Sequence, residues 1–295
     1  MAVTTTSTLD DLFTNIVAQA RFTAEEESLM LGLVTQYNIA GQAGKTIQVP
    51  KYPAITASAV AEGSDLSDTA VSTTSVPVTV SEVGAMVTLK DMALYGAGDP
   101  ASELGTVVGN SIATKIDVDL LAEFANFTAE QGTVAGALQA VDIFKAVATL
   151  KANKARGQLY GVIHPNQAYA LKAQLTNTFA PDTSNDLVNE AMRNGFIGTI
   201  AGVQMYESAN VKVDYTDLGD DNVSGGTGDD ADTTDQAVGA IFTAEALCIA
   251  MKNTFNLETQ RDASARANEL VATAVYGTEV LDQSFGVKLV TQKTL

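Results

Sequence analysis

The clearest pattern in the chain is a run of large apolar residues that recur every four positions between residues 99 and 127. That spacing places them on one face of an α-helix. Asp99 suits the N-cap and Pro100 suits the first helical position, so the pattern predicts one long helix over residues 99–127. At 1.5 Å per residue its length is roughly 40 Å. The members of the face are Leu104, Val108, Ile112, Ile116, Leu120 and Phe124, widened by Val107, Leu121 and Phe127.

Strand-like alternation dominates residues 44–94. A first strand is predicted at 45–50, where Pro50 ends it. Valines alternate at 76–80 and alternation resumes at 83–89, with a slip of one residue at Ser81-Glu82 that indicates a bulge or bend. The segment therefore reads as a long two-stranded hairpin with few large apolar residues. Because such a hairpin is marginally stable alone, we expect it to need support from outside itself.

Residues 1–43 are predicted to form an arm of two short amphipathic helices. Thr23 and Glu26 fit a capping box at the start of the second helix, and the acidic cluster Glu25–Glu27 suits the helix dipole there. The arm has little local core, so we expect it to pack on another subunit. The apolar positions of the first helix are Leu9, Leu12, Phe13, Ile16, Val17 and Ala20, and those of the second are Leu29, Met30, Leu33 and Val34.

Residues 132–255 are typical of an α/β unit. Helices are predicted before Gly157 and after Pro165, and strands at 159–163, 203–206 and 238–242. The predicted buried faces of the two helices are Val141, Phe144, Val147 and Leu150, and Ala168, Leu171 and Leu175. Eight of the 22 residues from Asp214 to Asp235 are Asp, which favours a solvated loop. Residues 256–295 return to strands at 270–277 and 285–290.

Composition narrows the function classes. The formal net charge of −18 argues against a continuous phosphate-binding surface. One Cys excludes an intrachain disulfide, and Cys248 lies in an apolar run that suggests a buried position. No stretch reaches 18 apolar residues, so we expect no membrane span. The N-terminal residues lack a basic region and an apolar run, so synthesis in a cytoplasm is expected.

Candidate nucleotide and catalytic motifs fail on their chemistry. Gly44-Lys45-Thr46 resembles the end of a P-loop, but Ile39 stands where the first Gly is required. Residues 96–101 fit a loose dinucleotide fingerprint, but Asp99 would face the pyrophosphate. The one histidine, His164, would have to serve any zinc site or triad, and we interpret it as a turn residue.

The acidic segment invites a calcium hypothesis. Asp220, Asn222 and Ser224 resemble the first half of an EF-hand loop, but Ala231 stands where a bidentate Glu is needed. Weak cation binding stays open as an alternative to a solubilising loop. We therefore expect no catalytic residue, no cofactor site and no metal site.

The order of these parts resembles the major capsid proteins of tailed phages with the Hong Kong 97 fold. Residues 59–63, 76–80 and 87–91 resemble the two strands and return of that family's E-loop, and residues 162–165 with 168–171 resemble its A-domain. The most specific match is the run from Gly195 to Ser208, Gly-Phe-Ile-Gly-Thr-Ile-Ala-Gly-Val-Gln-Met-Tyr-Glu-Ser. The final strands, with Phe255-Asn256-Leu257-Glu258, are similar to the returning P-domain.

The resemblance implies an α+β capsid fold with four parts. They are an N-terminal arm (1–43), an E-loop (44–94), a P-domain with the long spine helix (95–131 and 256–295) and an inserted A-domain (132–255) with the acidic loop 214–236. It also implies a non-enzymatic protein that forms hexamers and pentamers in a virion shell, assembled in the host cytoplasm. Such a shell encloses double-stranded DNA without sequence-specific binding. Scaffolding, portal and decoration proteins are the partners it suggests.

Some members of that family crosslink a Lys to an Asn, but Lys45, Lys51 and Lys90 match no such motif. Two alternatives to the capsid interpretation stay open. One is an encapsulin-like nanocompartment shell, which shares the fold and encloses an enzyme cargo. The other belongs to a different class, an acidic cation-binding surface or adhesion protein. An enzyme would require a pocket with converging titratable groups.

Overall fold

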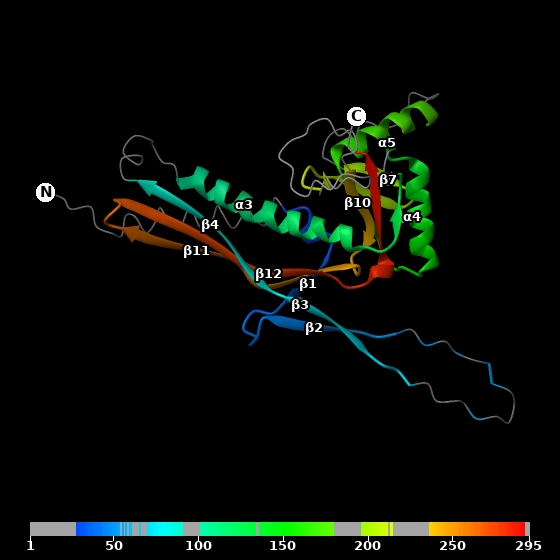
Figure 1. The fold of residues 1–295 in the computed structure, drawn as a ribbon, viewed down its shortest axis with the longest axis horizontal. Helices are drawn as coiled ribbons and strands as arrows, with labels where there is room; N and C mark the ends of the chain where they lie inside the picture. Colours follow the sequence, from blue (N-terminus) through cyan, green and yellow to red (C-terminus); the bar gives the residue numbers. More distant parts are fainter. Residues whose placement is uncertain are drawn as a thin grey trace, which may run out of the picture.

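The computed structural model describes residues 28–53, 55, 57, 59–60, 65, 70–90, 101–133, 136–179, 196–211, 213–214 and 236–292. Figure 1 shows a long limb, a compact unit at one end of it, and a two-stranded ribbon that projects from the region where they meet. The helices are η1 (Met30–Gly32), α3 (Ala101–Ala122), η2 (Glu123–Asn126), α4 (Ala140–Ala152), α5 (Pro165–Phe179) and η3 (Gln283–Phe285). The strands are β1 (Thr35–Asn38), β2 (Thr46–Lys51), β3 (Thr74–Thr79), β4 (Ser81–Lys90), β5 (Glu130–Gln131), β6 (Leu159–Ile163), β7 (Phe196–Ile200), β8 (Val203–Glu207), β9 (Val213–Asp214), β10 (Gln236–Thr243), β11 (Leu247–Asp262), β12 (Ala267–Val280) and β13 (Gly286–Gln292).

The limb is a four-stranded sheet with the order β1-β11-β12-β4, and α3 lies along it. The hairpin of β11 and β12 is its longest part, and β4 pairs antiparallel with β12 from Lys90 opposite Ala267 to Ser81 opposite Tyr276. Alternate residues of β12 such as Leu270, Ala272 and Ala274 are fully buried. Because alternate side chains of a strand point to opposite faces, only one face of this sheet takes part in the main core.

The long helix is confirmed, with two differences. α3 ends at Ala122 and passes into the 3-10 helix η2, and Asp99 and Pro100 lie outside the described residues. Val107 is 60% exposed, whereas Ala113 and Asp117 are buried. Leu121 and Phe127 are buried as predicted, and the face is widened on the side of Leu121 by Ala113 and Asp117, while Val107 lies outside it.

The compact unit is a mixed sheet with the order β5-β13-β10-β6-β8-β7, and β9 also pairs with β10. All eight residues of the central strand β10 are buried. Buried residues of α4, α5 and the sheet form one cluster that includes Ile143, Leu150, Leu171 and Ile241. β7 and β8 form a hairpin whose turn residues Ala201 and Gly202 both have positive φ, as in a type I′ turn.

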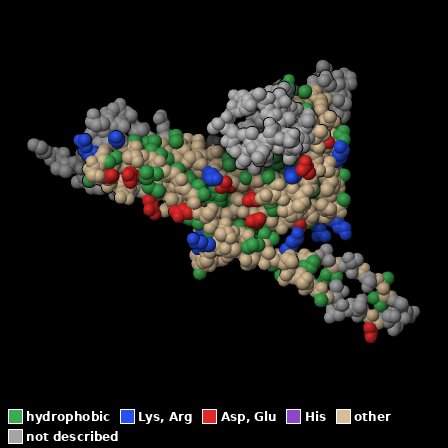
Figure 2. Space-filling model, in the orientation of Figure 1, with side chains coloured by type: hydrophobic (Ala, Val, Ile, Leu, Met, Phe, Trp, Pro, Cys, Tyr) green, Lys and Arg blue, Asp and Glu red, His purple; other side chains and the backbone are tan. Residues whose placement is uncertain are grey.

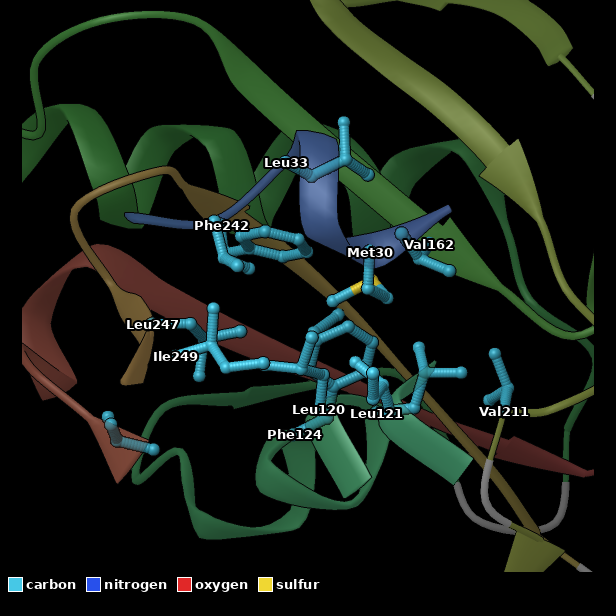
Figure 3. Packing of buried hydrophobic residues seen from close by; sticks show 14 of the residues in the cluster. Met30, Leu33, Leu120, Leu121, Phe124, Val162, Val211, Phe242, Leu247 and Ile249 are labelled. Atoms are coloured by element: carbon cyan, nitrogen blue, oxygen red, sulfur yellow. The ribbon is translucent and has the colours of Figure 1, made fainter. Parts of the chain in front are cut away.

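The main core joins the limb to the compact unit. Figure 3 shows Met30 and Leu33 from the N-terminal segment beside Leu120 of α3, Phe124 of η2 and Phe242 of β10. The rings of Phe124 and Phe242 are 5.4 Å apart between centroids. Because three separate stretches of the chain contribute to one cluster, the limb and the compact unit share a core.

Strand pairing corrects three predicted groupings. Residues 81–90 do not belong to the projecting hairpin, because β4 pairs with β12 in the limb while β2 pairs only with β3. The predicted limit at residue 255 falls inside β11, and β13 joins the sheet of β10 instead of the limb. Residues 28–43 are part of the body, since η1 enters the main core and β1 pairs in parallel with β11.

Three local predictions also change. The arm's second helix is limited, within the described residues, to the 3-10 turn Met30–Gly32, and the arm helix before residue 28 lies outside them. β2 continues through Pro50 to Lys51. The buried face of α4 is Ile143, Ala146, Val147 and Leu150, while Val141 and Phe144 are 54% and 55% exposed. The helix is rotated because its buried row packs against the sheet and leaves these two side chains outside.

A buried glutamine connects α5 to the sheet beneath it. Gln167 is 1% exposed, accepts a hydrogen bond from the N–H of His164 at 3.0 Å, and donates to the Ala237 carbonyl at 2.9 Å and the Thr291 hydroxyl at 2.6 Å. One side chain thus holds the first turn of α5 against β10 and β13.

Replacement of that glutamine leaves buried polar groups without partners. We expect Gln167→Ala to lower the free energy of unfolding by about 2 kcal/mol, since each stranded polar group costs about 1–3 kcal/mol. Chemical denaturation measures the change. The exposed Gln260→Ala variant is the control and should differ from the parent by less than about 0.5 kcal/mol.

Candidate assembly surfaces

The ribbon formed by β2 and β3 is attached to the limb through a small apolar cluster. Ile39, Val78, Val80, Cys248 and Ala250 are its buried members. The N–H of Val80 donates to the Lys45 carbonyl at 2.8 Å, and the Lys252 ammonium donates to the Gly44 carbonyl at 2.7 Å. We call this region, where residues 44–46 and 78–80 lie against β11 and β12, the ribbon root.

A close backbone contact at the ribbon root requires glycine. A Cβ atom at Gly277 in β12 would overlap the Thr79 carbonyl oxygen and lie 2.8 Å from its carbonyl carbon. Real Cβ atoms are essentially never found so close to backbone atoms. The absence of a side chain therefore permits β3 to cross β12 at this point.

An ion pair adds a second attachment farther along the ribbon. Lys51 Nζ lies 2.7 Å from Asp282 Oδ2, and the Asp282 side chain is only 16% exposed. Burial is the largest influence on the Asp282 carboxyl and raises its pKa, but hydrogen bonds from Lys51 and Ser284 outweigh it and hold the pKa below its ordinary value. The ribbon is thus tied to the segment that links β12 to β13.

Removal of this ion pair should have a small, pH-dependent effect. Lys51→Gln is expected to lower the free energy of unfolding by about 1 kcal/mol at pH 7, because exposed pairs contribute about 0–1 kcal/mol. A carboxyl with a lowered pKa stabilises the fold above its unfolded pKa and loses that contribution as the pH falls through its folded pKa. Denaturation at pH 7 and below pH 3 should therefore show the difference from the parent shrink toward zero in acid. An unchanged difference would contradict the ion-pair account.

Beyond these attachments the ribbon carries exposed apolar side chains. Tyr52 is 70% exposed and Ile55 is 60% exposed, and Val60 and Val71 are 45% and 46% exposed. Figure 1 shows the ribbon extending away from the limb and the compact unit. Two strands have only each other for support, so this part of the chain cannot bury its own apolar groups. These side chains are therefore available to a partner.

A buried carboxylate anchors the segment that leads into the body. Asp117 of α3 is 4% exposed and accepts hydrogen bonds from the Ser28 hydroxyl at 2.7 Å and from the N–H groups of Leu29 and Met30 at 3.1 Å each. Burial raises the pKa of Asp117 above its ordinary value, and the three hydrogen bonds oppose that rise. Asp117 thus fixes where residues 28–30 meet the spine helix.

The one histidine accepts a hydrogen bond at a helix start, and the one cysteine is buried. His164 Nδ1 accepts a hydrogen bond from the N–H of Asn166 at 3.2 Å at the start of α5. Cys248 is buried, and burial, with the nearby carboxylates Glu279 and Glu123, raises the pKa of its thiol to about 12. Such a thiol stays protonated at neutral pH and is a poor nucleophile.

The remaining candidate motifs of the sequence lead into a strand or lie outside the described residues. The segment Gly44-Lys45-Thr46 leads into β2, so no helix N-terminus faces a phosphate there. Residues 96–100, the acidic segment from Tyr215 to Asp235 and the Glu25–Glu27 cluster lie outside the described residues. Within the residues that the structure describes, no three His, Cys, Asp or Glu side chains are grouped to hold a metal ion. No helix of that same part is long and apolar enough to cross a bilayer.

Sequence reasoning missed the features that attach the ribbon and the N-terminal segment. The Lys51–Asp282 pair and the contact at Gly277 join residues far apart in the chain and leave no local signal. Asp117 did leave one, because it lies four positions from both Ala113 and Leu121, inside the buried row of the helix. A lone carboxylate at such a position indicates a buried hydrogen-bond acceptor.

Comparison with known proteins identifies the fold. No family model and no curated protein match the sequence. The capsid of Ralstonia phage GP4 superposes with a TM-score of 0.69 at 12% identity, covering 89% of this chain and 87% of that one. The capsid of cyanophage P-SCSP1u gives 0.65 at 17% identity, over 90% and 89%. A virus-like particle from Pyrococcus furiosus gives 0.57 at 10% identity, over 94% and 98%.

These likenesses extend over nearly the whole of each chain. The chain therefore has the α+β fold of tailed-phage capsid proteins, the Hong Kong 97 fold that the sequence predicts. Because the sequence identities are only 10–17%, these likenesses establish the fold alone. The function is argued from the surfaces described above.

Proposed function

We propose that this protein is a major capsid protein that self-assembles into the icosahedral shell of a tailed phage. The observation that carries the proposal is the ribbon, an extended element whose apolar side chains its own body leaves exposed. Exposed apolar groups on an element this thin favour association. A closed shell of identical copies covers such a ribbon on every subunit at once. The capsid fold supports this choice over other kinds of oligomer.

We further propose a division of the chain that follows the strand pairing. The arm precedes residue 28, and the ribbon is the E-loop. The limb with α3 is the P-domain, and the compact unit is the A-domain. The proposed limits are 44–80 for the E-loop, 28–43, 81–126 and 247–282 for the P-domain, and 129–246 with 286–292 for the A-domain. A role for scaffolding, portal or decoration proteins, assembly in a host cytoplasm and the lack of an enzymatic activity also belong to this proposal.

The ribbon provides the test of the proposal. The double variant Tyr52→Ser/Ile55→Ser removes its two most exposed large side chains in the described part of the ribbon. Burial of each is worth about 1.5–3 kcal/mol at an interface, so we expect the double variant to stay unassembled at concentrations where the parent forms shells. Analytical ultracentrifugation separates free subunits from particles.

The conservative variant Tyr52→Phe/Ile55→Leu is the matched control, because it keeps the apolar surface and should assemble. Normal assembly by the Ser variant would show that the apolar side chains of the ribbon are not part of the interface. Particles that carry protein cargo and no nucleic acid would favour the encapsulin-like alternative, which shares the fold. A requirement for calcium in folding or binding would instead favour the cation-binding surface protein.

A further inference from the structure

Acidic side chains predominate along the limb, whereas a basic group lies on the compact unit (Figure 2). Figure 2 shows acidic side chains along the limb, basic side chains at its far end, and a further group of basic side chains on the compact unit near the ribbon. A subunit that associates head to tail uses two different surfaces, one at each end of the contact. Opposite charges on the two surfaces suit that kind of contact.

The basic group lies at the end of α4. Lys151, Lys154 and Arg156 are all exposed, within six consecutive positions of a chain whose net charge is −18. No ion pair joins any of the three to another described residue at 4.0 Å or less. We call these three residues the basic surface.

The basic surface is held beside the ribbon by contacts that its sequence neighbours make. Asn153 Nδ2 donates to the Ser284 carbonyl at 3.0 Å, and Asp282, two residues earlier, pairs with Lys51 of the ribbon. The end of α4 and the ribbon therefore keep a fixed relation. A copy that receives the ribbon also meets the basic surface.

The acidic group lies on the face of the limb sheet that points away from α3, the face whose other end carries the ribbon root. Residues directly opposite in an antiparallel pair share a face, so Met86, Val271 and Glu258 form one rung across β4, β12 and β11. Glu82 and Glu269 lie an even number of residues from members of that rung and share its face. We call Glu82, Glu258 and Glu269 the acidic sheet face.

This face offers both charge and apolar contact. Met86 is 62% exposed, and the side chains that point the other way, such as Val83 and Val87, pack toward α3. Glu82 and Glu258 are exposed and Glu269 is partly exposed. Lys90 is the one described cation on this face of β4, at the far end of the strand. The face is therefore a broad, partly apolar surface with an excess of negative charge.

We propose that the basic surface of one copy docks on the acidic sheet face of a second copy, next to the ribbon that the first copy contributes. The proposal rests on the proposed function and specifies one of its interfaces. A second copy supplies three carboxylates for three cations at equal stoichiometry and places Met86 in the same contact. Nucleic acid suits the basic surface less well, because three cations at the negative end of a helix dipole, on an acidic protein, make no continuous track for a phosphate backbone.

Charge reversal tests the pairing. The basic-surface variant Lys151→Glu/Lys154→Glu/Arg156→Glu replaces attraction by repulsion, and so does the sheet-face variant Glu82→Lys/Glu258→Lys/Glu269→Lys. We expect each triple variant to raise the concentration needed for shell assembly at least about tenfold, given the contribution of exposed ion pairs. The variant that combines all six changes restores the complementarity and should assemble within about threefold of the parent. Light scattering against protein concentration gives the values.

A second combination controls for net charge. It joins the basic-surface variant to Asp220→Lys, Asp221→Lys and Asp230→Lys, which restores the same net charge of −18 as the parent. It should stay as defective as the basic-surface variant. Rescue by these changes would show that net charge or the acidic segment decides assembly, and would overturn the pairing.

Two further measurements keep the outcomes distinct. Thermal unfolding of each variant identifies any that fail to fold, and Lys151→Gln/Lys154→Gln/Arg156→Gln then serves as a milder version with an intermediate shift. Failure of the parent to assemble overturns the proposed function itself. Assembly by the parent and equally by both triple variants overturns only this interface. Loss of bound DNA with normal shells would assign the basic surface to nucleic acid and would also overturn it.

Discussion

Gly277→Ala should both destabilise the subunit and impair its assembly. The new methyl group would overlap the Thr79 carbonyl at the ribbon root, where the neighbouring atoms belong to the backbone of Thr79 and Val80 and not to a flexible side chain. Forcing β3 away from β12 should lower the free energy of unfolding by about 3 kcal/mol, the upper range for overpacking in a closed site. It also tilts the ribbon relative to the limb. Denaturation of the unassembled subunit and scattering by the assembled particle measure the two effects.

Gly32→Ala is the matched control for this substitution. A Cβ atom at Gly32 has no heavy atom within 4 Å, so the change should alter the free energy of unfolding by less than about 0.5 kcal/mol. Its shells should be normal. If Gly277→Ala were as harmless as Gly32→Ala, the ribbon root would not be the closely packed junction described here.

Asp117→Ala should have a comparable effect at the other attachment. The substitution leaves the Ser28 hydroxyl and the N–H groups of Leu29 and Met30 without their acceptor. We expect a loss of about 3 kcal/mol in the free energy of unfolding. Asp117→Asn keeps one oxygen acceptor and should lose only about 1 kcal/mol. Equal losses in the two variants would mean that the hydrogen bonds to residues 28–30 contribute little.

The stability difference between the parent and Asp117→Asn should change with pH in the opposite direction to the difference for Lys51→Gln. Because the pKa of Asp117 is raised in the folded state, the folded protein binds a proton more readily than the unfolded chain. This group therefore adds stability as the pH falls through its folded pKa, and that gain is complete below its unfolded pKa near 4. The difference in free energy of unfolding between the parent and Asp117→Asn should therefore be larger at pH 3 than at pH 7. A difference that does not grow in acid would contradict the raised pKa.

Elements with a strong internal period were predictable. The four-residue recurrence from Val108 to Phe124 identified α3, and the short apolar run at 159–163 coincides with β6. In these stretches the spacing of apolar residues is regular over the whole element, so the local pattern identifies the element and its type. The slip at Ser81 was also informative, because the chain leaves the ribbon and joins the limb at Val80.

Choice of partner strand was not predictable. Residues 81–90 alternate as the preceding valines do, and nothing in that alternation shows that β4 pairs with β12, nearly 200 positions later. The helical face of α4 was mispredicted for a similar reason. Val141 and Phe144 have the right spacing for a core, but the helix is rotated so that Ile143 and Ala146 meet the sheet. The exposed pair shows that a correct period does not determine which side is buried.

The most direct test of the central claim is electron microscopy of the purified full-length protein over a range of concentrations. We predict closed, hollow shells in which the ribbon of each copy lies on a neighbouring copy. Free subunits at every concentration, with Tyr52 and Ile55 folded back onto their own body, would contradict it.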